Sequence, residues 1–193
     1  MLEFDLRGVR CRVSPLFPGL LAVLSAASPD AATAVCVLAA AMHECGHLLA
    51  MAACGCPPDS LTMGAFGMRI AAGRTRRTGY ARQALIFLSG PLVNLLSGGA
   101  LWLLGCRRAA AVHLLLAAFN LLPAAALDGG QLLRCALCAA GGGRYAAAVL
   151  RALSAVVLLP LAAGSFLLFL RGANPSSVIV SLYLTLLVFW QPE

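Results

Sequence analysis

Residues 31–54 read AATAVCVLAAAMHECGHLLAMAAC. A helix needs roughly 20 residues to cross a bilayer, and this stretch has that length. Apart from Thr33 near its start, its polar side chains are those of His43, Glu44 and His47. Ionisable side chains inside a membrane helix are costly unless they are paired, bind a metal ion or face water. The stretch therefore predicts a membrane-spanning helix with a functional cluster of side chains within it.

The composition of the whole chain supports a membrane protein. Of its 193 residues, 61% are hydrophobic and only 11% are charged, and the mean hydropathy is +0.91. So few charges cover the surface of a soluble domain poorly, and the lipid bilayer is the expected surrounding. Nucleic acid is not expected as a partner, because the arginines are dispersed among loops without interleaved aromatic residues. The eight cysteines are interpreted mainly as small apolar residues of membrane helices, with a metal or redox role for Cys54–Cys56 and Cys135–Cys138 as the alternative.

Six apolar runs predict an all-α polytopic membrane protein with about six transmembrane helices, in one domain that covers residues 1–193. The first run is short and is either a span or a re-entrant segment. Alternating apolar and polar residues near the N-terminus, and again between Leu61 and Ile70, predict a small β-hairpin or sheet at the membrane interface. The predicted runs are 16–28, 31–54, 81–106, 109–133, 145–170 and 178–190.

The distribution of arginine predicts the orientation. All 14 basic residues are arginines, and most of them fall in the N-terminal arm, the loop 55–82 and the region 134–151. These segments lie on the same side of the predicted topology, and the positive-inside rule places that side in the cytoplasm. The arginine distribution thus predicts an integral membrane protein with residues 43–47 in the cytoplasmic half of the membrane.

The spacing of His43 and His47 predicts a zinc site. Residues four positions apart project from one face of a helix, so both imidazoles can reach a single tetrahedral zinc ion. Glu44 lies beside them and is the candidate general base for a metal-activated water. The alternative is a polar cluster that only links helices by hydrogen bonds.

A catalytic zinc ion usually has three protein ligands, so one more is expected. Apart from Glu44, Asp128 is the only acidic residue within an apolar stretch, and a metal ion is the best partner for a buried carboxylate. A carboxylate exposed at a helix end is the alternative. His113 is placed at the interface on the opposite side of the membrane, and we do not expect it to be a ligand.

Three motifs together resemble the site-2 protease family of intramembrane zinc metalloproteases. They are His43-Glu44-Cys45-Gly46-His47, Gly90-Pro91-Leu92-Val93-Asn94, and residues 120–130, NLLPAAALDGG. The resemblance implies His43, His47 and Asp128 as zinc ligands, Glu44 as general base, and supporting roles for Asn94 and Asn120. Hydrogen bonding between helices is an alternative role for the two asparagines.

The layout is similar to the branch that contains stage IV sporulation protein FB, without the CBS domain of that branch or the PDZ domain of others. This resemblance implies a bacterial cell membrane as the location. The expected function is that of a zinc endopeptidase with one Zn²⁺ per chain. It would cleave a membrane-anchored protein within or next to its membrane segment, as in regulated intramembrane proteolysis. The alternatives are a polytopic metal transporter and an inactive zinc-binding relative.

Overall fold

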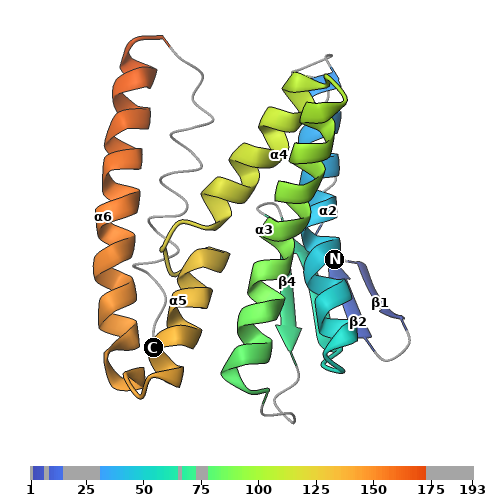
Figure 1. Cartoon of the computed structure of the whole chain (residues 1–193), viewed down its shortest axis with the longest axis vertical. Helices are drawn as coiled ribbons and strands as arrows, with labels where there is room; N and C mark the ends of the chain where they lie inside the picture. Colours follow the sequence, from blue (N-terminus) through green and yellow to red (C-terminus); the bar gives the residue numbers. More distant parts are fainter. Residues whose placement is uncertain (1, 7–8, 15–30, 65–66, 73–77, 173–193) are drawn as a thin grey trace. The chain divides into compact units, whose positions relative to one another are not determined.

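The computed structural model describes residues 2–6, 9–14, 31–64, 67–72 and 78–172 (Figure 1). The chain divides into two compact units, residues 1–117 and 118–193, and each is described by itself. Helices make up most of the described part. Helix α4 (Arg107–Asn120) runs through the boundary between the units.

The first unit is built on the packing of α2 (Ala31–Ala53) against α3 (Tyr80–Leu103). Gly46 permits this contact, because a Cβ atom there would lie 2.8 Å from the carbonyl oxygen of Ser89 and 3.1 Å from Cα of Gly90. Apolar helices in lipid gain little from hydrophobic burial against each other, so close backbone approach at small residues is a main source of their attraction. Helix α2, which carries His43 and His47, is thereby held directly against α3.

A second close approach joins α3 to α4. A Cβ atom on Gly98 would meet the side chain of Leu114 at 2.8 Å and the carbonyl oxygen of Ala110 at 3.3 Å. Residues 104–106 form the short turn between the two helices, and Gly105 within it has a φ of +79°. Helices joined by so short a turn run antiparallel, so residues at similar distances from the turn face each other.

The first unit also holds a four-stranded sheet in the order β1-β2-β3-β4. The two hairpins are antiparallel, and β2 joins them by pairing in parallel with β3, with Arg10 opposite Ser60. The parallel pair brings together segments that lie on either side of α2 in the sequence. The outer strands are β1 and β4, and the position of the sheet at the membrane interface stays a prediction. The strands are β1 (Leu2–Leu6), β2 (Val9–Val13), β3 (Pro58–Gly64) and β4 (Gly67–Ala72).

The second unit contains the end of α4, a turn over residues 121–127, and helices α5 (Asp128–Ala139) and α6 (Gly143–Leu170). The turn packs on α6 through a buried cluster of Ala124, Leu127 and Leu158, with Phe119 and Leu122 at its margin. Gly141, with a φ of +80°, lies in the reversal between α5 and α6. Figure 1 shows α5 as a short helix beside the longer α6.

Three described helices are long and apolar enough to cross a membrane, and they support an integral membrane protein. They are Thr33–Ala53, Tyr80–Leu103 and Gly143–Leu170. The single span predicted for residues 109–133 is wrong, because the chain there forms two short helices separated by the turn around Pro123. The runs predicted at 16–28 and 178–190 lie outside the described residues, so a total of six spans stays a prediction.

Candidate metal centre

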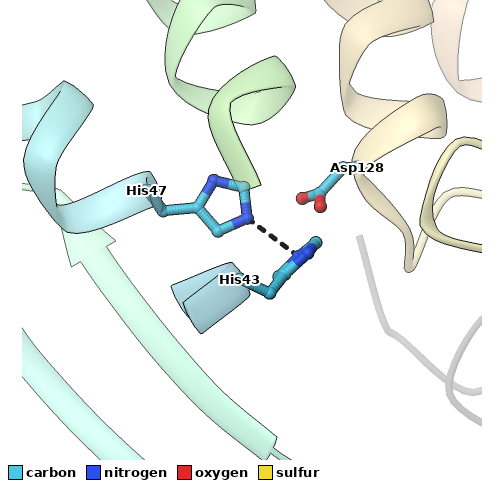
Figure 2. A group of neighbouring side chains, drawn as sticks. All are labelled: His43, His47 and Asp128. Atoms are coloured by element: carbon cyan, nitrogen blue, oxygen red, sulfur yellow. Dashed lines mark hydrogen bonds between the residues drawn. The ribbon is translucent and has the colours of Figure 1, made fainter. Parts of the chain in front are cut away.

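His43 and His47 face each other on α2. Their Nε2 atoms lie 3.1 Å apart, and their rings meet nearly edge-on at an interplanar angle of 84° (Figure 2). Both side chains are buried, with exposed fractions of 6% and 7%. The spacing of four residues puts both rings on one face of the helix, as the sequence predicts.

Each imidazole is oriented by a contact to α3. The Nδ1 atom of His47 donates to the carbonyl oxygen of Ile86 at 2.7 Å, and Nδ1 of His43 lies 3.2 Å from Nδ2 of Asn94. Contacts to Nδ1 fix the rotation of an imidazole and leave Nε2 to reach a metal ion. Asn94, predicted as a supporting residue, therefore contacts the histidine pair directly.

Gly90 provides the space that these rings occupy. A Cβ atom at this position would lie 2.6 Å from Cε1 of His47 and 2.9 Å from Cε1 of His43. Such distances are well inside van der Waals contact, so any larger residue would displace the rings. Gly90 of α3 is thus part of the wall of the histidine site.

Replacing Gly90 with alanine should weaken metal binding by about 10-fold or more, because the added Cβ would displace the two imidazole rings and changes that disturb ligand orientation typically cost about 10–100-fold in affinity. Gly99 is the matched control: it lies on the same helix, and a Cβ atom there would meet nothing within 4 Å. Both substitutions raise helix propensity equally. Zinc affinity can be measured by competition with a chromophoric chelator. Equal affinities of G90A and G99A would contradict the assigned role of Gly90.

His113 is buried, with an exposed fraction of 2%, and its Nδ1 lies 3.1 Å from Oδ1 of Asn94. Its position at the membrane interface stays a prediction. Helix α4 begins at Arg107, which puts His113 about 9 Å along the helix axis. The antiparallel turn after α3 then brings it level with Asn94. Pairing polar residues across this short turn could have revealed the contact.

Asp128 is the first residue of α5, in the second unit. The two glycines that follow it, Gly129 and Gly130, belong to the first turn of α5. A Cβ atom on Gly129 would collide with the carbonyl oxygen of Leu121, and one on Gly130 with that of Ala124. Two glycines are therefore needed for the turn to fold back against the start of α5 and define the position of the carboxylate in this unit.

Ser154 of α6 fixes the same turn. Its hydroxyl accepts from the backbone N–H of Ala125 at 2.8 Å and donates to the carbonyl oxygen of Leu150 at 2.6 Å. Gln131 of α5 donates to the carbonyl oxygen of Ala125 at 2.7 Å. Both backbone polar groups of Ala125 are therefore bound by side chains of the flanking helices. Sequence analysis missed both residues, since serine and glutamine carry no signal of this role.

Ser154→Ala should destabilise the second unit by about 1–3 kcal/mol, because it removes the hydroxyl acceptor for the backbone N–H of Ala125. A loss of this size should lower the midpoint of thermal unfolding in detergent by a few degrees. Ser165→Ala is the control on the same helix, since the Ser165 hydroxyl donates to Ala162 within α6. Equal midpoints for the two variants would exclude Ser154 as the residue that secures the turn.

The other predicted residues are located as follows. Glu44 follows His43 on α2 and is half-buried, and Asn120 is the half-buried last residue of α4. Within the first unit the structure thus brings together His43, His47 and Asn94, and adds His113. Asp128 and Asn120 belong to the second unit, and Figure 2 draws Asp128 with the two histidines.

The histidine pair fits a zinc ion. Two imidazole nitrogens bound at about 2.0–2.1 Å to one tetrahedral zinc ion lie about 3.3 Å from each other. The observed Nε2–Nε2 distance of 3.1 Å is close to this value. The two Nε2 atoms are therefore close enough to each other to bind the same metal ion.

Comparison with known proteins identifies the fold. No family model matches the sequence, and no curated protein matches it. Among solved structures, the chain is similar to the site-2 protease from Methanocaldococcus jannaschii, with a TM-score of 0.67 and 22% sequence identity. The alignment covers 95% of this chain and 91% of the other. The chain has the fold of a site-2 protease.

Proposed function

We propose that this protein is an intramembrane zinc endopeptidase of the site-2 protease family. The observation that carries the proposal is the facing pair of Nε2 atoms of His43 and His47, on a helix apolar enough to span a membrane. The fold similarity and the three sequence motifs support it. A membrane-anchored protein, cut within or next to its membrane segment, is the proposed substrate.

In this proposal His43, His47 and Asp128 hold one zinc ion per chain. The donor set of two imidazoles and one carboxylate is one that catalytic zinc sites use. A bound zinc ion would acidify a ligated water and polarise the carbonyl of the scissile bond. Because the site lies among apolar helices, the carboxylate of Asp128 would also offset part of the charge of the metal ion.

Glu44 is the proposed general base and acid. It lies one residue from one proposed ligand and three from the other, so its carboxylate starts from the same stretch of α2. It would accept a proton from the attacking water and then deliver that proton to the nitrogen of the leaving amine. Asn94 orients His43, and Asn120, at the end of α4, is proposed as a further polar residue near the site.

Strand β4 is a proposed docking edge for the substrate. A helical substrate hides its peptide bonds, so the scissile segment must be extended before it is cut. An extended segment can add to an exposed sheet edge through main-chain hydrogen bonds. In the described sheet β4 is an outer strand that pairs with β3 on one side.

A chelation experiment tests the proposed function. The probe is a synthetic single-span peptide with a fluorophore and a quencher at its ends and helix-weakening glycines in its cytoplasmic half. The purified full chain in detergent should cleave it, 1,10-phenanthroline should stop cleavage, and added zinc should restore it. The non-chelating isomer 1,7-phenanthroline is the control. Cleavage that persists after complete removal of zinc would contradict a metalloprotease, and zinc transport into vesicles without cleavage would favour the transporter.

A further inference from the structure

Three buried polar side chains on three helices form a continuous hydrogen-bonded row. His43 on α2 contacts Asn94 on α3, and Asn94 contacts His113 on α4, at distances of 3.2 Å and 3.1 Å. Asn94 has an exposed fraction of 0%. Buried polar groups need partners within the protein, so each end of the Asn94 amide depends on one of the two histidines. His113 is the end of the row and does not reach the proposed ligands directly.

The donors and acceptors of this row can be assigned by starting from His47, which contacts His43. A neutral imidazole carries one proton, and His47 uses it on Nδ1 to donate to Ile86. Nε2 of His47 is therefore an acceptor, and Nε2–H of His43 donates to it. Nδ1 of His43 then accepts from Nδ2–H of Asn94, and Oδ1 of Asn94 accepts from Nδ1–H of His113.

Metal binding requires donor and acceptor to be exchanged in the two hydrogen bonds that link His43, Asn94 and His113. A histidine that binds through Nε2 has its proton on Nδ1 and needs an acceptor there. For His43 the acceptor is Oδ1 of Asn94, which a half-turn of the amide group brings into the position of Nδ2. The amide nitrogen then points to His113, so Nδ1 of His113 has to accept and its proton has to lie on Nε2.

We propose that His113 is a positioning residue for the metal centre. Its Nδ1 accepts from the amide of Asn94 and holds the amide oxygen against Nδ1–H of His43, which keeps Nε2 of His43 available for the metal ion. The inference rests on the proposed zinc site and extends it to a residue that contacts Asn94 and not a ligand, on a helix that carries no proposed ligand. Histidine suits this place because its Nδ1 can accept or donate according to its tautomer.

The test is a comparison of zinc affinities of the full chain in detergent. His113→Leu removes the acceptor and should weaken zinc binding by about 10-fold, as loss of outer-shell partners does. His113→Asn places an amide oxygen near the position of Nδ1 and should retain affinity within about threefold. If His113→Leu does not fold, His113→Met replaces it, because methionine fills similar space and is only a weak acceptor.

A double-mutant cycle separates this role from a merely structural one. If His113 acts through Asn94, Asn94→Ala combined with His113→Leu should bind zinc no more weakly than Asn94→Ala alone. Additive losses, equal losses for His113→Leu and His113→Asn, or wild-type affinity in His113→Leu would each overturn the proposal. Failure of the wild-type chain to bind zinc would instead contradict the proposed function, and the proposed role of His113 would lose its basis with it.

Discussion

Replacing Glu44 with glutamine should reduce cleavage of the single-span peptide by about 1000-fold or more. General acid–base catalysis contributes roughly 10²–10⁴-fold to a rate, and here one carboxylate would serve as base and then as acid. Glutamine has nearly the same shape but cannot accept or deliver the proton. The proposed ligands are untouched, so zinc content, helicity and thermal stability should stay at wild-type values. kcat/KM and zinc content of the same preparation are the measurements.

Cys45 provides the control for this variant. It lies next to Glu44 on α2, is exposed, and has no assigned role in the chemistry. Cys45→Ala should therefore retain both cleavage and zinc. Full activity of Glu44→Gln would exclude Glu44 as the catalytic residue, and loss of zinc from that variant would mean that its inactivity reports on the metal site instead.

Asp128→Asn should weaken zinc binding by more than about 100-fold and abolish cleavage at limiting zinc. Asparagine keeps the size of aspartate, but a neutral amide oxygen is a far poorer zinc ligand than a carboxylate. The loss should exceed the 10–100-fold typical of outer-shell residues, because the ligand itself is removed. Elemental analysis after dialysis against a weak chelator measures the occupancy.

Asp5, exposed on strand β1, serves as the control for this charge change. Asp5→Asn should bind zinc like the wild type. If Asp128→Asn also kept its zinc through dialysis, Asp128 would not be a ligand, and the third ligand would have to be sought among other residues. That result would leave the contacts of His43 and His47 to α3 unaffected.

Prediction from the sequence succeeds best for features that depend on the residues of a single helix. The bounds of α2 and the shared face of His43 and His47 follow from an apolar run and a spacing of four residues, and both are observed. Asn94 was identified only through the motif resemblance. Its contact with His43 depends on how closely α2 approaches α3, which is decided by glycines at positions 46 and 90.

The errors occur where tertiary contacts override a local pattern. Residues 109–133 are apolar enough to be read as one span, but the turn around Pro123 binds to Ser154 and Gln131 and divides the run. The parallel pairing of β2 with β3 joins strands that are distant in the sequence, and no local alternation of residues encodes it. The contact of His113 with Asn94 depends on how the short turn joins α3 to α4.

X-ray absorption at the zinc edge of the loaded full chain tests the central claim most directly. With His43, His47 and Asp128 as ligands, the spectrum should contain only nitrogen and oxygen neighbours at about 2.0–2.2 Å, with the scattering of two imidazole rings. The same measurement on Asp128→Asn should show an altered first shell or too little zinc to observe. A sulfur shell at about 2.3 Å would instead place a cysteine on the metal ion and contradict the proposed site.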